Sequence, residues 1–318
     1  MQKGKKNSIH FELLILGSSS AIPSDARFPS SQVLRIGEEL FLIDCGEASQ
    51  NRLWSHRVRW SKIGWILISH LHGDHVYGLP GLITSFCHLQ RTQPLIITGP
   101  LGIRDFLENI LRHSQVHLTF EIEYLELDQK VQVIYKDDWR KITAFPLDHR
   151  IPTMGYLFEA EKKIRRLDLE KVQKTDIPLD HYQKVVKGES VQDSTGRIYE
   201  PDELSFIEIF KRSYAYCSDT RYKESLVSVL KNVDVLYHET TYLHELLDKA
   251  IQTGHTTAKQ AAEFAKLIQA GQLITGHYSS RYKILTPILE ECQSIFPNTV
   301  LGYEGLKLEI LPRGNEIG

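Results

Sequence analysis

Short apolar runs bounded by turn residues recur along the chain, and they predict β-strands. The runs cover residues 13–16, 40–43, 65–69, 95–98, 131–135 and 142–145. Apolar residues at helical spacing, each time opened by a polar residue or proline, predict helices over residues 103–111, 223–230, 259–268 and 287–296. Because strands and helices alternate in both halves of the chain, the pattern indicates a layered α/β domain.

One segment, residues 159–212, departs from this alternation because its pattern becomes charged and irregular. We expect it to be an arm inserted into a single domain of residues 1–318. Its basic run includes Lys162, Lys163, Arg165 and Arg166. On charge alone, this run is either a projection that grips the phosphates of a nucleic acid or a solvated surface whose acidic neighbours compensate the charge.

The strongest chemical signal lies directly after a predicted strand, where His70, His72, Asp74 and His75 fall within six residues. A lone histidine is more often a surface or core residue, but this density favours a metal site. Imidazole nitrogens and carboxylate oxygens are zinc ligands in catalytic sites, and without thiolates the ion stays acidic enough to ionise a bound water. Because four ligands from one short loop would crowd a tetrahedral ion, the spacing indicates two ions with further ligands from elsewhere.

Three other predicted strands end in ligand-type residues. The strand over residues 142–145 leads to His149, the strand over 214–218 leads to Asp219, and the strand over 273–276 leads to His277. Sites in α/β folds are usually assembled where strands end. Each residue alone also fits a capping or turn role, Asp219 especially, since aspartate is common at helix N-caps. Their joint placement favours a shared metal site.

Composition limits the class of protein. The chain has 318 residues, of which 42% are hydrophobic and 25% charged, so it can bury a sizeable core. Its formal net charge of −2 gives no overall attraction to polyanions, so a nucleic-acid substrate needs a local basic surface. The apolar run at residues 13–16 is too short for a signal-peptide core or a membrane span, and we expect a cytoplasmic protein without membrane contact. Reduced, buried thiols are expected at the scattered cysteines, Cys45, Cys87, Cys217 and Cys292.

The run at residues 70–75 resembles the signature of the metallo-β-lactamase superfamily, and the blocks around it resemble ribonuclease Z, the short-form tRNA 3′-processing endonucleases. These blocks lie in family order at residues 15–23 with Arg27, 42–47, 70–82, 146–152, 216–220, 238–241, 254–258 and 276–282. The resemblance implies a four-layer αββα sandwich with a flexible inserted arm that contacts the tRNA elbow. In many members the arm carries a glycine- and proline-rich stretch, to which residues 180–189 have only a faint likeness.

The resemblance further implies two zinc ions per chain and a metal-bridged hydroxide as nucleophile. The implied ligands are His70, His72 and His149 for one ion, Asp74, His75 and His277 for the other, and Asp219 as a bridge between both. Asp74 is also suited to accept the proton of the attacking water. The resemblance makes His255 the acid that protonates the departing 3′-oxygen and Glu239 the residue that orients its ring, because an alkoxide is a poor leaving group.

Purely structural roles remain possible alternatives for these residues. His255 is otherwise a loop residue before a helix, and Glu239 is otherwise a buried structural partner. Arg281 either contacts a substrate phosphate or forms a salt bridge.

The function expected from the resemblance is a zinc-dependent endoribonuclease that removes the 3′ trailer of precursor tRNA and leaves a 3′-hydroxyl on the tRNA. The family arrangement also implies a homodimer in which the arm of one subunit serves the active site of its partner. Two other functions stay open: a hydrolase of small phosphodiesters on the same dinuclear site, and a non-catalytic RNA-binding scaffold. The first would not need the arm, and the intact ligand set weighs against the second.

Overall fold

The structure is a computed structural model that describes residues 9–22 and 27–311. Residue contacts divide the chain into two compact units. The first comprises Met1–Asp137, Lys141–Glu159 and Arg212–Gly318 as far as these are described, and the second comprises Asp138–Arg140 and Ala160–Lys211. Pro23, which belongs to the first sequence block of the resemblance, lies outside the described residues.

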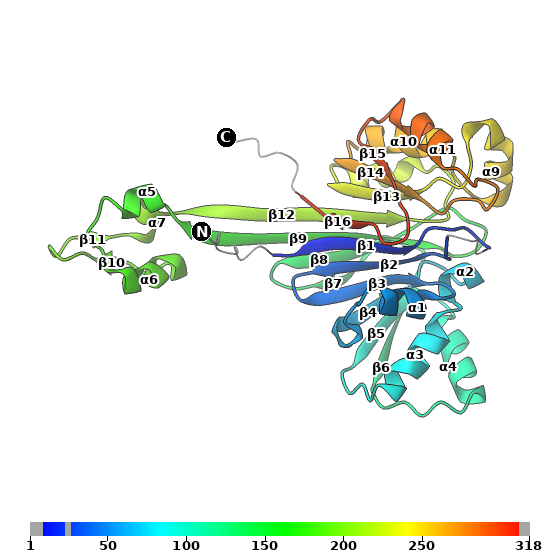
Figure 1. Ribbon diagram of the computed structural model, residues 1–318, viewed down its shortest axis with the longest axis horizontal. Coiled ribbons are helices and arrows are strands. Elements are labelled where there is room, and N and C mark those ends of the chain that lie inside the picture. The colour runs from blue at the N-terminus through cyan, green and yellow to red at the C-terminus, as the bar shows by residue number, and fades with distance from the viewer. Residues whose placement is uncertain (1–8, 23–26, 312–318) are drawn as a thin grey trace. The chain divides into compact units, whose positions relative to one another are not determined.

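The first unit contains two seven-stranded sheets (Figure 1). The first sheet has the order β16-β1-β2-β3-β4-β5-β6, in which β3 to β6 pair in parallel and β1 to β3 pair antiparallel. Its strands are β1 (Phe11–Gly17), β2 (Ser31–Ile36), β3 (Glu39–Cys45), β4 (Ile63–Leu67), β5 (Leu95–Pro100), β6 (Ile122–Leu127) and β16 (Lys307–Glu309). Most of these strands are buried on both faces, which explains their continuous apolar runs in the sequence.

The second sheet has the order β15-β14-β13-β12-β9-β8-β7, with β12 to β15 pairing in parallel. Its strands are β7 (Gln132–Lys136), β8 (Arg140–Pro146), β9 (Met154–Leu167), β12 (Ser205–Cys217), β13 (Val235–Glu239), β14 (Gln272–Gly276) and β15 (Thr299–Leu301). Buried aromatic and polar side chains fill the space between the two sheets. The rings of Phe41 and Phe158 meet edge to face at 5.6 Å, and the Tyr216 hydroxyl donates to Asp44 across the interface.

Helices cover the outer face of each sheet, so the first unit is an αββα sandwich as the sequence predicts (Figure 1). The helices on the first sheet are α1 (Ser49–Ser55), α2 (Gly73–Val76), α3 (Leu79–His88) and α4 (Ile103–His113), with the short 3-10 helix η1 (Trp60–Lys62). Those on the second sheet are η3 (Glu224–Leu226), α8 (Val227–Leu230), η4 (His244–Leu246), α9 (Leu247–Thr253), α10 (Ala258–Leu267) and α11 (Thr286–Gln293). Each outer layer closes its own apolar core. Leu82 and Phe86 of α3 pack in the first core, and Phe264 of α10 packs in the second.

The predicted strands and helices all occur, with shifts of a few residues at their ends. The clearest difference is at residues 223–230, where the predicted helix is a 3-10 turn followed by a single α-helical turn. All four cysteines are buried and free, which confirms the prediction of reduced thiols. Among the helices of the described residues, none combines the length and the apolar composition that a membrane crossing requires.

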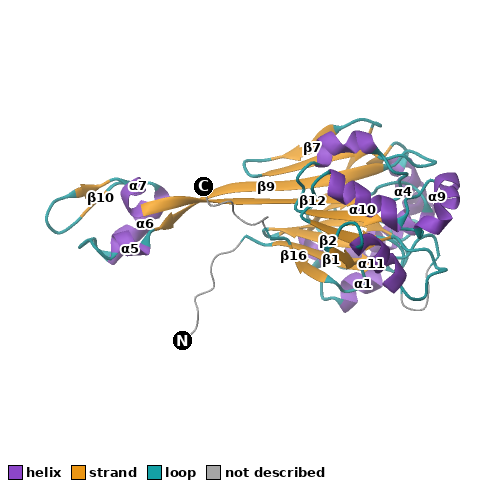
Figure 2. Ribbon diagram, turned by 90° about the horizontal axis from the view of Figure 1, so that it is seen from above, coloured by secondary structure: helices purple, strands orange, loops and turns teal. Residues whose placement is uncertain are grey.

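The second unit is a small body of short helices and strands (Figure 2). It has its own apolar cluster. Besides the ends of β9 and β12 it holds α5 (Leu169–Val172), η2 (Leu179–His181), α6 (Tyr182–Lys187), β10 (Val191–Gln192), β11 (Ile198–Tyr199) and α7 (Pro201–Leu204). Its cluster comprises Val172, Ile177, Val185, Val191, Tyr199 and Leu204. The expectation of irregular structure over residues 159–212 is wrong at both ends of the segment, because β9 and β12 run into it as strands. Charged residues concealed the outer part of β9, since a solvated strand needs no apolar run, whereas the exposed apolar residues Phe206, Ile207 and Ile209 of β12 were an available signal.

Candidate metal centre

Loops that follow the carboxyl ends of four strands supply the ligand-type residues. His70 and His72 follow β4, His149 follows β8, Asp219 follows β12, and His277 follows β14. The structure therefore brings together residues that lie as far apart as 207 positions in the chain, because these strand ends meet at one edge of the sandwich.

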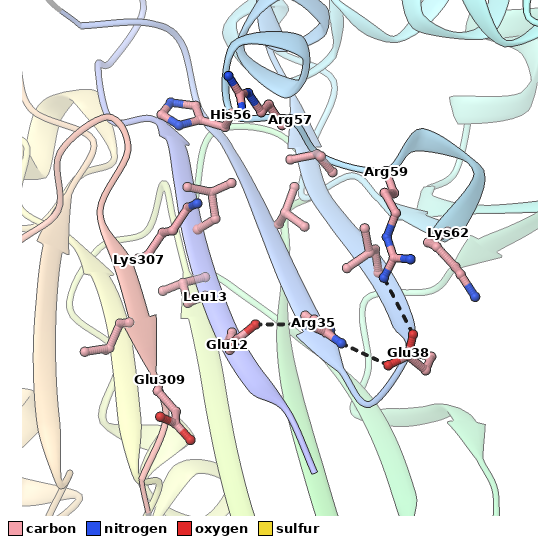
Figure 3. Close-up of a pocket in the computed structure, with 15 residues that line it drawn as sticks. Glu12, Leu13, Arg35, Glu38, His56, Arg57, Arg59, Lys62, Lys307 and Glu309 are labelled. Atoms are coloured by element: carbon pink, nitrogen blue, oxygen red, sulfur yellow. Dashed lines mark hydrogen bonds and ion pairs between the residues drawn. The ribbon is translucent and has the colours of Figure 1, made fainter. Parts of the chain in front are cut away.

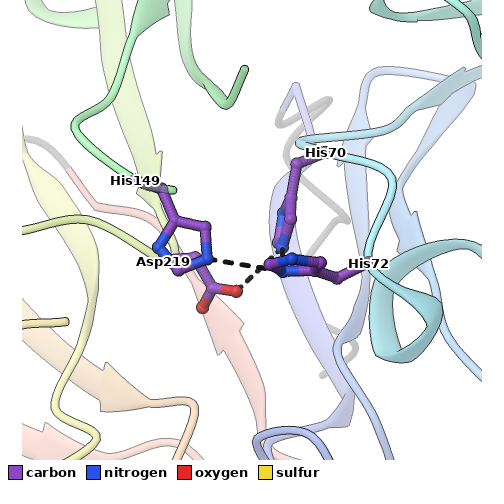
Figure 4. A group of neighbouring side chains, drawn as sticks. All are labelled: His70, His72, His149 and Asp219. Carbon is purple, nitrogen blue, oxygen red and sulfur yellow. Dashed lines mark hydrogen bonds and ion pairs between the residues drawn. The ribbon is translucent and has the colours of Figure 1, made fainter. Parts of the chain in front are cut away.

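The first cluster consists of His70, His72, His149 and Asp219, whose ligand atoms lie within 4.8 Å of one another (Figure 4). Nε2 of His70 lies 2.9 Å from Oδ2 of Asp219 and 2.9 Å from Nδ1 of His72. Nε2 of His149 lies 3.3 Å from the same Nδ1. Three ring nitrogens and one carboxylate oxygen thus converge on one small space.

The second cluster consists of Asp74, His75, Asp219 and His277, again with ligand atoms within 4.8 Å of one another. Nε2 of His277 lies 2.9 Å from Oδ1 of Asp219 and 3.5 Å from Oδ2 of Asp74. Nε2 of His75 lies 3.3 Å from Oδ2 of Asp219. Asp219 therefore faces both clusters, and the two groups are the same as those that the sequence resemblance implies for a pair of ions.

Oxygen acceptors at the outer nitrogen fix the orientation of the imidazoles. Nδ1 of His75 donates to Asp44 over 2.7 Å, and Nδ1 of His149 donates to the carbonyl of Gly254 over 2.8 Å. Nδ1 of His277 donates to the Thr241 hydroxyl over 3.0 Å. Nε2 of each ring is thereby directed into the cluster, which is how outer hydrogen bonds prepare a histidine for a metal.

Gly254 has a specific role in this arrangement. Its φ of 80° is in the left-handed region, and a Cβ atom at this position would lie 2.8 Å from Nδ1 of His149. A side chain here would therefore both strain the backbone and displace the ring that the Gly254 carbonyl orients.

Asp44 contacts both clusters indirectly, and the sequence analysis gave it no role. Its fully buried carboxylate accepts hydrogen bonds from the backbone and hydroxyl of Ser69, from Tyr216 and from His75. The Ser69 hydroxyl donates to Asp44 and in turn accepts a hydrogen bond from Nδ1 of His70 over 3.0 Å. One carboxylate thus orients an imidazole in each cluster. The sequence did contain a signal for this role, namely an aspartate that directly follows the apolar run at residues 40–43.

Three residues of the site also have an unusual backbone conformation. Asp44, Asp219 and His277 have φ values of 56°, 54° and 54°, which non-glycine residues seldom adopt. Such conformations persist where the surrounding structure enforces them, and they concentrate at functional sites.

The histidines of the first cluster are in the protonation state that metal binding requires. Burial, together with the neighbouring imidazoles of His70 and His149, lowers the pKa of His72 to about 4. Burial likewise lowers the pKa of His149 to about 4. Both rings are therefore neutral at pH 7 and carry a lone pair, as metal binding requires.

The second cluster attracts positive charge. Against the effect of burial, the carboxylate of Asp219 raises the pKa of His277 to about 10. Burial also opposes ionisation of Asp74, yet the imidazoles of His75 and His277 hold its pKa well below the usual range. Oδ1 of Asp219 is buried and has no aligned hydrogen-bond donor among the described residues. A cation between these groups would satisfy that oxygen, so the residues fit a pair of divalent ions.

Glu239 and His255 form a pair beside the two clusters. Nδ1 of His255 donates to Oε1 of Glu239 over 3.0 Å, while the same carboxylate accepts from Thr220 and Thr241. Burial opposes protonation of His255, but the charge of Glu239 raises the pKa of the imidazole above its usual value. Its ring is 12% exposed and lines the cleft, so Nε2 can meet a substrate.

An open cleft of about 620 Å³ leads to the clusters. It is lined by Ser20, Ala21, Ile22, Pro29, Glu47, His72, Gly73, Asp74, Tyr77, His149, Arg150, Asp219, Thr241, Tyr242, Thr253, His255, His277, Ser279 and Ser280. Arg150 is a cation in this wall to which the sequence analysis gave no role. Arg281 does not line the cleft: it donates to the Ser279 hydroxyl over 3.1 Å and lies 5.2 Å from the ring of Tyr242.

The basic residues of the second unit differ in their surroundings. Arg165 pairs with Asp202 over 2.5 Å, and Arg166 pairs with Glu208 over 2.8 Å. Lys162 lies 5.5 Å above the ring of Trp139. Lys163 is exposed and forms no ion pair within the ranges that the structure describes. Half of the predicted basic contact is thus already neutralised by carboxylates.

Known proteins resemble this chain over most of its length. Residues 11–294 match the family model described as Anti-Pycsar protein Apyc1. Ribonuclease Z of Porphyromonas gingivalis is 38% identical over 301 residues, which cover 94% of this chain and 99% of that relative. The crystal structure of human tRNase Z, short form, is 26% identical with a TM-score of 0.68 and covers 94% of this chain and 99% of that chain.

A further solved structure supports the fold alone. The metallo-β-lactamase fold protein YhfI from Bacillus subtilis is 16% identical, with a TM-score of 0.67 over 94% of this chain and 99% of that chain. The αββα sandwich described above is therefore a metallo-β-lactamase fold, as the sequence predicts.

Proposed function

This chain belongs to the ribonuclease Z family, which confirms the resemblance found in its sequence blocks, and we propose that it removes the 3′ trailer of precursor tRNA as a metal-dependent endoribonuclease. The observation that carries the proposal is the pair of His/Asp clusters that share Asp219 at the base of an open cleft. A cut that leaves a 3′-hydroxyl on the tRNA is the expected outcome.

We propose that the centre holds two zinc ions per chain. His70, His72 and His149 would hold one ion, Asp74, His75 and His277 would hold the other, and Asp219 would contact both. When bound, such ions lower the pKa of a coordinated water and offset the charge that develops on the phosphate. The neutral rings of the first cluster and the anionic surroundings of the second support this assignment.

Asp74 is the residue we assign as proton acceptor. It lines the cleft, and its low pKa keeps the carboxylate ionised at neutral pH. The backbone amide of Ala21 donates to its Oδ2 over 2.7 Å and holds the side chain in place. Because a carboxylate with so low a pKa is a weak base, it can accept a proton only from a water that a bound ion has already made acidic.

His255 is assigned as the acid for the leaving group. Its hydrogen bond to Glu239 occupies Nδ1, so the proton on Nε2 is the one available to the cleft. The raised pKa keeps a useful fraction of the imidazole protonated at neutral pH. Glu239 acts as a positioning residue, because it is fully buried and reaches the substrate only through His255.

The second unit is the natural candidate for the arm that contacts the tRNA elbow, with Lys162 and Lys163 as its available cations. Arg165 and Arg166 enter this assignment only if tRNA displaces their carboxylate partners. We also propose a cytoplasmic homodimer in which the arm of one subunit serves the active site of its partner, by analogy with the family.

The test is cleavage of a 3′-extended tRNA transcript by purified protein whose metal content is measured. Asp74→Ala should abolish cleavage while tRNA binding changes little, because the substituted carboxylate lies within the metal centre. Asp128→Ala is the matched control, since Asp128 pairs with Lys130 at the surface and should leave cleavage intact. Loss of tRNA affinity with an unchanged rate constant in Asp74→Ala would contradict the mechanism.

A second candidate function is hydrolysis of small phosphodiesters at the same centre. The match to the Anti-Pycsar protein Apyc1 family model over residues 11–294 is the reason to test this candidate. The open cleft of about 620 Å³ also has room for a nucleotide-sized ester. Such an activity would need no arm. Equal or higher kcat/KM for a small diester than for precursor tRNA would favour this candidate.

A further inference from the structure

A groove outside the catalytic cleft lies beside the carboxyl end of α1 (Figure 3). It has a volume of about 340 Å³, and its floor is apolar, formed by residues such as Leu14, Val33 and Leu40. Charged side chains surround that floor. They are Glu12, Arg35, Glu38, Arg57, Arg59, Lys62, Lys307 and Glu309, with His56 beside them.

Three of these cations have no carboxylate partner. Glu38 forms ion pairs with Arg35 at 2.9 Å and with Arg59 at 3.6 Å. Arg57, Lys62 and Lys307 form no ion pair with any residue of the described ranges. The groove therefore presents a local positive charge on a chain whose formal net charge is −2.

The end of the groove at His56 and Arg57 is lined by neutral and positively charged side chains. His56 accepts a hydrogen bond from Arg52 over 2.8 Å, so its ring is neutral. Burial and the nearby charges of Arg52 and Lys307 lower the pKa of His56. An anion at this end would meet cations from the loop after α1 and from β16.

A second hollow, of about 580 Å³, adjoins the first and shares Arg57 and Val58 with it. Its other walls are Trp54, Ser55, Trp60 and Leu89. The Trp54 side chain is 73% exposed and is held edge to face against Trp60 at 6.2 Å. An exposed indole beside an unpaired arginine is the combination that stacks an unpaired base and neutralises its phosphate.

Helix α1 connects this surface to the catalytic cleft. Glu47 lines the cleft and precedes Ser49, the first residue of α1. Trp54 follows Ser49 by five residues, so at about 1.5 Å of rise per residue it lies roughly 8 Å further along the helix. An RNA strand that leaves the cleft can therefore reach Trp54 within a few nucleotides.

We propose that this surface, which we name the α1 groove, binds the unpaired 3′ trailer of the precursor, with a base stacked on Trp54 and phosphates on the three unpaired cations. The inference rests on the proposed function and adds where the product strand lies. Charge favours RNA over a second copy of this chain, because self-association would bring two sets of uncompensated cations together. Self-association is retained as an outcome of the test.

The experiment compares two precursors of one tRNA, one with a trailer of about two nucleotides and one with a trailer of about ten. The variants are Trp54→Ala and the triple Arg57→Ala/Lys62→Ala/Lys307→Ala. The matched control is Arg112→Ala/Lys231→Ala/Lys266→Ala, which removes three exposed cations away from the groove. Values of kcat/KM, the salt dependence of RNA binding and the oligomeric state are measured for each protein.

The groove variants should lose the advantage of the long trailer and keep wild-type kcat/KM on the short one. We expect Trp54→Ala to weaken long-trailer binding roughly tenfold, which is within the range of one stacked base. The triple variant should reduce the salt slope of binding by about two, since each phosphate contact to a single strand contributes about 0.7. The control should match wild type on both precursors.

Several results would overturn the inference: equal effects on both trailers, no effect on either, or dissociation of an oligomer without any change in trailer dependence. The last result would identify the groove as an interface between copies of the chain. Cleavage of the short precursor by the wild type reports separately on the proposed function, so failure there is distinguishable from failure of the groove.

Discussion

Replacement of His255 by alanine tests the chemistry of the proposed site most selectively. The substitution removes the only imidazole that hydrogen-bonds to the carboxylate of Glu239 among the described residues, while every proposed metal ligand stays in place. Because His255 precedes α10 and its ring lies at the wall of the cleft, the change should leave the fold intact. The leaving 3′-oxygen would then depart without a proton donor.

The size of the effect follows from the role. A positioned general acid contributes roughly two to four orders of magnitude in rate. The raised pKa of His255 and its orientation by Glu239 indicate that this contribution is largely available at neutral pH. We therefore expect His255→Ala to lower kcat by about 10²- to 10⁴-fold, with little change in KM.

The assay compares two precursor tRNAs under single-turnover conditions. One carries the ordinary 3′-oxygen at the cleavage site, and the other carries a bridging 3′-sulfur, which leaves readily without protonation. The defect of His255→Ala should shrink to less than about tenfold on the sulfur substrate. A defect of the same size on both substrates would refute the role of His255 as acid and leave it a structural residue.

Three further changes probe the surrounding residues. Glu239→Gln should move the basic limb of the kcat–pH profile to lower pH, because loss of the carboxylate charge lowers the pKa of His255 and the protonated form is lost earlier as pH rises; an unmoved limb would contradict the pairing. Asp44→Asn should weaken metal affinity by roughly 10- to 100-fold in competition with a chelator, since the buried carboxylate orients His75, and an unchanged affinity would argue against that role. Replacing residues 160–211 by a short linker should raise KM for precursor tRNA and spare an activated small phosphodiester, whereas equal losses on both would mean that the arm is structural.

The sequence predicted those parts of the structure that depend on local pattern. Runs such as residues 40–43 identify strands because both faces of the sheet are buried, and the apolar positions of residues 103–111 repeat with helical spacing. The arm was harder to predict. Its strands are mainly solvated, the outer part of β9 is charged, and its small cluster of six buried side chains leaves little trace in the pattern; the apolar residues Phe206, Ile207 and Ile209 of β12 were a signal that the sequence analysis missed.

The site was predictable only in part from residue types. The density of His70, His72, Asp74 and His75 identifies metal chemistry, while the convergence of Asp219 and His277 depends on how the two sheets bring strand ends together. Hydrogen bonds that orient the ligands are non-local, as between Asp44 and His75, and no spacing in the sequence reveals them. The uncompensated cations of the α1 groove were equally hidden, because they come from three separate segments.

The most direct test of the account is gel mapping of the cut on a defined precursor tRNA, with end-group analysis, before and after removal of metal by a chelator. We predict one cut on the 3′ side of the acceptor stem that leaves a 3′-hydroxyl, disappears on chelation and returns when a divalent ion is added back. A cut that persists without metal, or the absence of any cut by metal-loaded protein, would contradict the claim that the paired His/Asp clusters form a tRNA-processing centre.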